Sequence, residues 1–238
     1  MTRPPDKSKD KSFQTDFGTF YAPNISTDLT YGIGSWSDLD IANAVLKGTS
    51  PDGQHYYPAF PYGSYGRADI ADIADLIAFL RTLEPDQTPS VAHDVAFPFN
   101  IRASLGGWKM LFARSSWVVN GTLSPEQTRG RELVEALGHC GECHTPRNVL
   151  GGMKRDAWLA GAAIPNSKGR TPDIRPETLQ WTSNDIVAYL KTGLTPDYDS
   201  AGGEMVEVIA NTSQLPDSDL AAIAAYLLWV PEAEVAEK

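Results

Sequence analysis

The pattern of apolar and polar residues along the chain predicts helices rather than strands. Within residues 124–138 apolar residues recur at helical spacing, at Leu133, Val134 and Leu137. Ser124 and Gln127 have the spacing of a capping box, so a helix is expected to begin there. Gly138 is expected to end it. This helix would have one buried face and would lead directly into the residues that follow Gly138.

Similar elements occur twice along the chain. The segment WSDLDIANAVLKGTSPD at residue 36 resembles WTSNDIVAYLKTGLTPD at residue 181, at a constant offset of 145 residues. The matching positions include Trp36 with Trp181, Asp40 with Asp185, Ile41 with Ile186, and Gly48 with Gly193. An amphipathic helix is expected after each copy, in DIADLIAFLRTLEP at residue 72 and DLAAIAAYLLWVPE at residue 219. We therefore expect a duplicated module of about a hundred residues.

The composition is that of a folded and acidic protein. The 238 residues include six Trp and nine Tyr, with a net charge of −10 and an isoelectric point near 4.8. Nucleic-acid binding needs a basic surface and is excluded, whereas an acidic face would steer a basic partner protein. No apolar run approaches the roughly 20 residues that span a bilayer, and the N-terminus shows no apolar signal region.

The candidate chemistry lies in the segment GHCGECHTPRN, residues 138–148. It holds the two cysteines of the sequence, Cys140 and Cys143, with His144 directly after them. C-x-x-C-H is the pattern of covalent haem attachment. The two thiols add to the haem vinyl groups, and the histidine becomes an axial ligand of the iron.

Two cysteines at this spacing could also form a disulfide, a redox pair or part of a zinc site. A disulfide between residues three apart would close a very small loop and stabilise little. A thioredoxin-like pair should lie between a strand and a helix, whereas a helix precedes this motif. A zinc site would need further ligands, and His55, His93 and His139 are not at ligand spacing.

A second axial ligand is expected opposite His144. Met205 lies in the glycine-rich loop SAGGEMVEVI, between the motif and the last helix. The glycines would let the backbone approach a haem closely, and methionine is a common ligand in electron-transfer haems. The alternative is that Met205 only fills the core. His139 and Met153 are poorer candidates, because both lie close to the motif in sequence.

Several segments together carry a family resemblance: FGTFYAPNIS, GIGSWSD, PDGQHYYPAFPY, FPFNIR, RGRELVEALGHCGECHTPRN, WLAGA and GGEMVEVIANTSQLPDSDLAAIAAYL. With them the chain resembles the diheme and multiheme c-type cytochromes of the bacterial periplasm. It is similar to the cytochrome subunits that accept electrons from membrane-bound alcohol, fructose and gluconate dehydrogenases. The segments extend over most of the chain, and their combination is specific although each alone is weak.

The resemblance implies a mostly α fold of two tandem cytochrome c-like modules. A degenerate module without C-x-x-C-H would occupy residues 1–85, a linker 86–123, and a cytochrome c domain 124–238. It implies that haem c is attached through Cys140 and Cys143, with His144 and Met205 as the two iron ligands.

The same resemblance implies an electron carrier rather than an enzyme. It would accept single electrons from a dehydrogenase subunit and deliver them to a downstream acceptor. It would bind no nucleic acid and would work in the periplasm or at the outer face of the inner membrane. Membrane association would come only through partners or through an N-terminal segment missing from this sequence.

The first module departs from the family pattern. No C-x-x-C-H precedes FGTFYAPNIS, Phe60 and Ala68 occupy the positions where a methionine is expected, and no Met lies between residues 2 and 109. Either a truncation has removed the first haem motif, or the module has degenerated to a haem-less scaffold. His55 is either a surviving ligand or a surface turn residue. We expect one haem in this sequence.

Further expectations concern residues around the motif. A backbone or nearby carbonyl is expected to accept the Nδ1–H of His144. Arg147 is either a partner of a haem propionate or a surface arginine. Trp158 and Leu159 are expected to wall the haem pocket. The apolar pocket residues are also expected to include Ile174, Trp181, Ile186 and Leu190.

Two further expectations concern the contact between two helices and the segment that joins the modules. Gly130 is expected to let Tyr226 of the last helix pack closely. The segment LGGWKMLFARSSWVV, within 86–123, is either a membrane-surface or partner-binding patch, or a linker with Trp108, Phe112 and Trp117 buried.

Two rival functions stay open from the sequence. A thiol-disulfide oxidoreductase using Cys140 and Cys143 would have a redox-active dithiol and no visible absorption. A haem-poor scaffold subunit of a dehydrogenase complex would keep the complex active after loss of the attachment cysteines.

Overall fold

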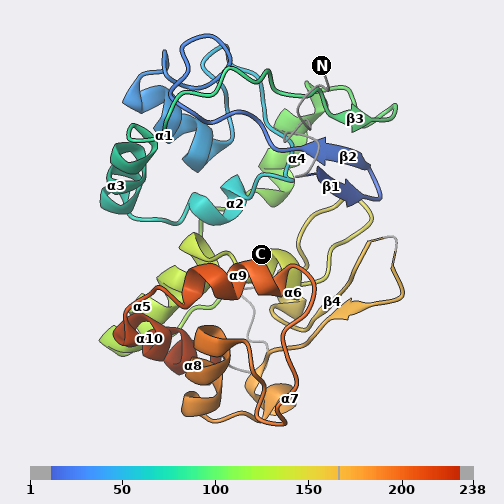
Figure 1. Ribbon diagram of the computed structural model, residues 1–238. Coiled ribbons are helices and arrows are strands. Elements are labelled where there is room, and N and C mark those ends of the chain that lie inside the picture. The colour runs from blue at the N-terminus through green and yellow to red at the C-terminus, as the bar shows by residue number, and fades with distance from the viewer. Residues whose placement is uncertain (1–11, 166, 231–238) are drawn as a thin grey trace, which may run out of the picture. The chain divides into compact units, whose positions relative to one another are not determined.

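The computed structural model describes residues 12–165 and 167–230 and is rich in helices (Figure 1). The chain divides into two compact units. Unit 1 comprises the described residues up to Ser115 together with a short segment at 164–168, and unit 2 comprises the remainder. The division at residue 115 falls inside the segment 86–123 that the sequence suggests as a linker.

Unit 1 combines helices with a small antiparallel sheet of strand order β1-β2-β3. Its elements are β1 (Ser12–Thr15), β2 (Gly18–Tyr21), α1 (Asp38–Lys47), α2 (Tyr62–Tyr65), α3 (Ile70–Leu80), β3 (Asp94–Val95) and α4 (Ser104–Phe112). In the β1–β2 hairpin Phe13 is paired with Phe20. Phe20, Tyr57 and Leu105 form a small buried cluster. The strands of this sheet are only two to four residues long, too short to show an alternating pattern, so the sequence predicted helices and not this sheet.

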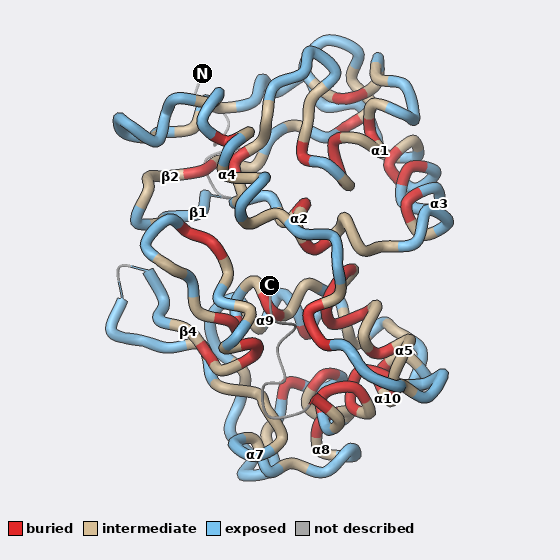
Figure 2. Tube along the Cα trace, turned by 180° about the vertical axis from the view of Figure 1, so that it is seen from behind, coloured by how far each residue is buried: buried red, intermediate tan, exposed pale blue. Residues whose placement is uncertain are grey.

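Unit 2 is built around its last helix. Its elements are α5 (Pro125–Arg131), η1 (Glu132–Leu137), α6 (Gly141–His144), η2 (Arg155–Ala157), β4 (Ala162–Ala163), β5 (Arg170–Thr171), α7 (Pro176–Leu179), α8 (Ser183–Thr192), α9 (Met205–Thr212) and α10 (Asp217–Leu227). Much of α10 is buried (Figure 2), and all of its buried residues belong to one large apolar cluster.

Helices α1 and α8 repeat each other in detail. Each begins with a capping box and ends at a glycine in the left-handed conformation. The residues are Ser37, Asp40 and Gly48 for α1, and Thr182, Asp185 and Gly193 for α8. After each helix the chain turns back to the glycine, with Tyr56 N–H donating to Gly48 O and Ala201 N–H to Gly193 O, both at 2.8 Å. These equivalent bonds obey the same offset of 145 residues as the sequences.

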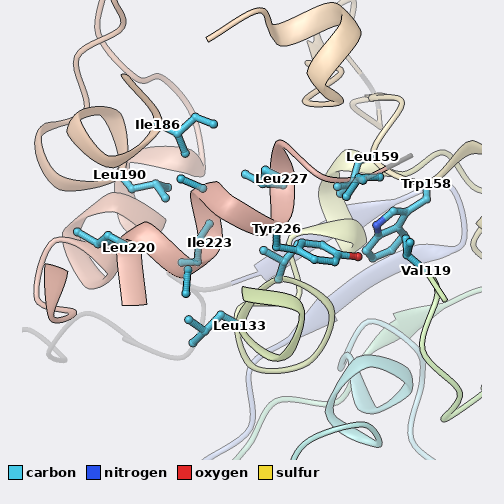
Figure 3. Close-up of a cluster of buried hydrophobic side chains, with 14 of the residues drawn as sticks. Val119, Leu133, Trp158, Leu159, Ile186, Leu190, Leu220, Ile223, Tyr226 and Leu227 are labelled. Carbon is cyan, nitrogen blue, oxygen red and sulfur yellow. The ribbon is translucent and has the colours of Figure 1, made fainter. Parts of the chain in front are cut away.

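Helices α5 and α10 cross closely at Gly130, as the sequence predicts. A Cβ atom at Gly130 would lie 1.9 Å from the Ala222 carbonyl oxygen and 2.6 Å from Tyr226 Cβ. Only a residue without a side chain permits this approach. Around the crossing, Leu133, Leu220, Ile223 and Leu227 pack with Tyr226 (Figure 3).

Helix α3 matches α10 in sequence but differs in burial. Tyr226 of α10 is fully buried, whereas its counterpart Phe79 in α3 is 60% exposed. α3 packs against α1, and no helix among the described residues of unit 1 crosses it as α5 crosses α10. The burial of an apolar helix face therefore depends here on its neighbour, not on its own pattern.

The segment 86–123 is more structured than a plain linker. It includes β3 and the nine-residue helix α4. Trp108, Phe112 and Trp117, which one of the two alternatives for this segment expected to be buried, are half-buried. Within residues 12–165 and 167–230, no helix is both long enough and apolar enough to cross a membrane.

Candidate functional site

The helix that leads to the two cysteines begins as the sequence predicts. Gln127 N–H donates to Ser124 Oγ at 3.2 Å, and Ser124 N–H donates to Gln127 Oε1 at 2.9 Å. Pro125 occupies the first turn, where its missing N–H costs no hydrogen bond. These contacts fix where α5 starts, and therefore which face it presents to α10.

The turn before the motif is a π-helix rather than the expected α-helix. Residues Glu132–Leu137 form it, and Gly138 caps it. Gly138 N–H donates to Leu133 O at 2.7 Å, and Cys140 N–H donates to Val134 O at 3.0 Å. Such wide turns are rare and occur frequently at functional sites. Gly138 ends the helix as predicted, but the sequence carried no signal of the wider turn.

One short helical turn presents both cysteines and the histidine. His144 N–H donates to Cys140 O at 3.0 Å, and Cys143 N–H donates to the same oxygen at 3.3 Å. Both thiols are free; Cys140 is half-buried and Cys143 is exposed. The C-x-x-C-H spacing therefore closes a compact turn from which two thiols and one imidazole project.

The imidazole of His144 is buried and held by a backbone carbonyl. Its Nδ1 lies 2.8 Å from the carbonyl oxygen of Pro172. A carbonyl only accepts, so the proton lies on Nδ1 and the Nε2 lone pair remains for a metal. Desolvation lowers the pKa of His144, which favours the neutral form that binds metals. The expectation of a nearby carbonyl acceptor is confirmed, with Pro172 as the residue.

The backbone on either side of His144 is also fixed. Gly161 N–H donates to His144 O at 2.7 Å. The side chain of Thr145, 1% exposed, accepts from Leu159 N–H at 3.0 Å. Neither Thr145 nor Pro172 was singled out from the sequence, because their partners lie 14 and 28 residues away.

Trp158 packs directly against the motif. A Cβ at Gly141, between the two cysteines, would lie 2.0 Å from the Trp158 ring. Trp158 and Leu159 are buried, as expected, in the large cluster of unit 2. The other expected pocket residues belong to this cluster or pack against it: Ile174, Trp181, Ile186 and Leu190.

The electrostatics of the two thiols disfavour thiolates. Burial raises the pKa of Cys140 to about 11. Desolvation also raises the pKa of Cys143, and the neighbouring carboxylates of Glu142 and Glu204 raise it further. Both groups therefore remain protonated thiols at neutral pH.

Met205 is the first residue of α9 and is half-buried. It packs against the same cluster as Cys140 and Met153. The residue before it, Glu204, is near enough for its charge to act on Cys143. The structure thus brings the N-terminus of α9 to the neighbourhood of the motif. His139, the other weaker candidate, has positive φ and a pKa lowered by burial.

Arg147 folds back onto the motif helix. Its guanidinium pairs with Glu142 and donates to Gly151 O at 2.9 Å. The sequence analysis did not foresee Glu142 as a partner, although the two residues are five positions apart. The arrangement joins α6 to the loop that follows it.

Unit 1 offers different residues at the equivalent places. Phe60 stands 145 positions before Met205, and its ring lies 5.6 Å from that of Tyr65. His55 is half-buried, with its Nδ1 3.1 Å from Lys109 Nζ. His55 therefore lies in a turn, partly exposed, with a lysine as its neighbour.

Known proteins resemble this chain over nearly its whole length. It is 57% identical over 220 residues to a "Diheme cytochrome c-type" protein of Cereibacter sphaeroides, covering 92% of this chain and 74% of that protein. It is 40% identical over 228 residues to the "Fructose dehydrogenase cytochrome subunit" of Gluconobacter japonicus. It is 35% identical over 232 residues to the "Alcohol dehydrogenase (quinone), cytochrome c subunit" of Gluconobacter oxydans.

The coverage of these relatives differs. The two matches to dehydrogenase subunits each cover 92% of this chain, but only 46% of the fructose dehydrogenase subunit and 48% of the alcohol dehydrogenase subunit. The chain thus spans about half of those subunits. No protein-family model matches the chain.

Proposed function

The chain belongs to the family of diheme c-type cytochromes and dehydrogenase cytochrome c subunits, and on this premise we propose that it transfers single electrons through one covalently attached haem c. Cys140 and Cys143 form the thioether bonds, His144 is one iron ligand and Met205 the other. The observation that carries the proposal is the single turn that presents both thiols beside an imidazole whose Nδ1 is bonded to Pro172 O.

The residues present fit a haem. The two thiols are unpaired with each other, and Nε2 of His144 is the imidazole nitrogen left for iron. The imidazole, the thioether of Met205 and their apolar surroundings match the ligand set of electron-transfer haems. The bound haem would supply an iron that cycles between two oxidation states.

The protein's own residues position the site and limit water. Pro172 O holds the ring of His144 in one tautomer, and Trp158 packs on the turn between the cysteines. Met205 supplies a soft sulfur ligand, and the apolar cluster around it excludes water, which favours the reduced form. Arg147 is a candidate partner of a haem propionate, in exchange for its present contact with Glu142.

The two units are proposed to be tandem cytochrome c-like modules, at 1–85 and 124–238, joined through 86–123. The repeated caps and turns of α1 and α8 support this. The first module has Phe60 in place of Met205 and no attachment cysteines, so these 238 residues would carry one haem.

The proposed partners are an electron-donating dehydrogenase subunit and a downstream acceptor in the respiratory chain. The names of the relatives support the donor, and the net charge of −10 favours a basic docking face on a partner. The proposed location is the periplasm or the outer face of the inner membrane, where covalent haem attachment takes place in the family that the chain resembles.

The two rival functions are less well supported. A thiol-disulfide oxidoreductase needs a thiolate with a lowered pKa, whereas the pKa of both thiols is raised. A scaffold without redox function does not require two thiols and an imidazole presented together on one turn, as they are at Cys140, Cys143 and His144.

The experiment is expression of this chain behind an export signal with a cytochrome c maturation system. A haem stain on a denaturing gel and a pyridine haemochrome spectrum should show one covalent haem per chain. The Cys140→Ala, Cys143→Ala double variant should show none. A parent protein without covalent haem would exclude the electron-carrier function for these residues.

A further inference from the structure

A carboxylate lies in the interior of unit 2 without a role in haem attachment. Glu135 is 0% exposed and sits in the π-helical turn before the motif. Its Oε2 accepts from Val118 N–H at 2.5 Å, and its Oε1 accepts from Val119 N–H at 3.1 Å and from the Tyr226 hydroxyl at 2.6 Å. A buried acid with three donors is built into the fold rather than left there by chance.

The hydrogen bonds from Val118, Val119 and Tyr226 all reach Glu135 from donors, and a carboxylate accepts such bonds with both of its oxygens. Burial, and then the charge of Glu135, raise the pKa of Tyr226. Arg131, one turn earlier, stacks 4.4 Å from the centre of the Trp117 ring, and its charge also acts on Tyr226. A negative charge thus lies inside unit 2, with a positive one nearby.

Glu135 is connected to the attachment turn by two routes. Along the backbone, its neighbour Val134 accepts the hydrogen bond of Cys140 N–H at 3.0 Å. Through side chains, Glu135 holds the Tyr226 hydroxyl, which points toward the Trp158 indole (Figure 3). Trp158 in turn packs on Gly141, between the two cysteines.

We propose that Glu135 is a positioning residue that also sets the redox potential of this centre: it holds Tyr226 and Trp158 against the attachment turn, and its buried negative charge lowers the midpoint reduction potential. This inference rests on the proposed function. It assigns a role to a residue that neither attaches haem nor coordinates iron.

The direction of the effect follows from charge. The oxidised centre carries one more positive charge than the reduced centre, so a nearby negative charge stabilises the oxidised form. In a buried region this interaction is weakly screened. Replacing Glu135 by a neutral residue should therefore raise the midpoint potential.

The test compares Glu135→Gln with two matched variants in the full haem-loaded chain. Glu126→Gln removes the same charge from an exposed position on α5, where solvent screens it. Glu135→Asp keeps the charge with a shorter side chain. Midpoint potentials are measured by spectroelectrochemistry, with covalent haem content and thermal unfolding recorded for each protein.

Glu135→Gln should raise the midpoint potential by about 59 mV. For one electron this is a roughly tenfold change in the oxidised-to-reduced ratio at a fixed applied potential, toward the reduced form. Glu126→Gln and Glu135→Asp should stay near the parent value. A haem-loaded Glu135→Gln protein with the parent potential would overturn the proposal, as would equal shifts in the Gln and Asp variants. If the Gln variant does not hold haem, Glu135→Met, which is neutral and of similar length, gives the readout: a raised potential supports the proposal and the parent potential overturns it.

The outcome is separable from the proposed function. Absence of covalent haem in the parent protein contradicts the proposed function. Covalent haem in the parent with a potential insensitive to Glu135 contradicts only this inference.

Discussion

The Nδ1 atom of His144 lies 2.8 Å from the carbonyl oxygen of Pro172, a residue 28 positions further along the chain. The bond fixes the ring tautomer and orientation before any metal is bound. The polypeptide therefore prepares the iron ligand by its own folding, and the cost of orienting the imidazole is met in advance.

Replacing this imidazole tests its role as a ligand. His144→Ala should abolish stable haem incorporation, because the attachment turn then offers thiols but no nitrogen ligand. The control is His139→Ala. It removes the histidine directly before Cys140, which lies outside the C-x-x-C-H motif, and it is expected to retain haem. Haem stain and pyridine haemochrome give the readout. Equal haem content in both variants would contradict the assignment.

Met205 can be tested by a change that preserves packing. Met205→Leu keeps an apolar side chain of similar volume but removes the sulfur. Covalent haem should remain, while the absorption spectrum changes and the reduction potential falls, because methionine ligation raises it. Met153→Leu is the matched control and should leave both unchanged. The reverse result would make Met153 the ligand.

The crossing of α5 and α10 predicts a cost for a single methyl group. Gly130→Ala would place Cβ 1.9 Å from Ala222 O, so unit 2 should lose about 1–3 kcal/mol of unfolding free energy. Gly107→Ala in α4 is the control, because nothing lies within 4 Å of its added Cβ. There alanine should be neutral or stabilise by up to about 1 kcal/mol. Urea denaturation of both variants measures the difference, and similar effects would show that the crossing is not tight.

Unit 1 should lose stability in mild acid through His93. Tyr21 N–H donates to His93 Nδ1 at 3.2 Å, which requires a neutral ring, and burial followed by the charge of Arg102 lowers the pKa of His93 below 6.5. The unfolded chain then binds the proton more readily. The contribution of neutral His93 to the free energy of unfolding is complete above about pH 6.5. It is lost as the pH falls through the lowered pKa of His93 in the folded protein.

His93→Gln removes this titration while leaving an acceptor for Tyr21. Urea denaturation from about pH 5 to 8 should show a shallower fall in stability for the variant than for the parent. Parallel curves for the two proteins would exclude His93 as the cause.

The sequence was a good guide where a feature depends on neighbouring residues. The capping box of Ser124 and Gln127 and the end of the helix at Gly138 were predicted and are confirmed, and each follows from residue types within one turn. The close approach of Gly130 to Tyr226 was also predicted and is confirmed, but that prediction came from the family resemblance, in which the two terminal helices cross.

Other features that depend on distant partners were not predicted. Nothing local to Pro172 marks it as the acceptor for His144, and nothing local to Glu135 marks it as a bonded interior acid. The exposure of Phe79 was likewise hidden, because its sequence matches the buried Tyr226 and only the neighbouring helix differs. Tertiary contacts decide all three.

The π-helical turn at Glu132–Leu137 also constrains how this segment can vary in length. Such a turn accommodates one residue more than an α-helix, and each α-helical residue rotates the chain by about 100°. Removing one residue between the Gly130 crossing and Cys140 would let the helix regularise and would keep the cysteines near the same side of the helix axis, because the wide turn has already absorbed the extra residue. A further one-residue insertion has no such compensation: it would rotate the attachment turn by about 100° relative to the core that holds it.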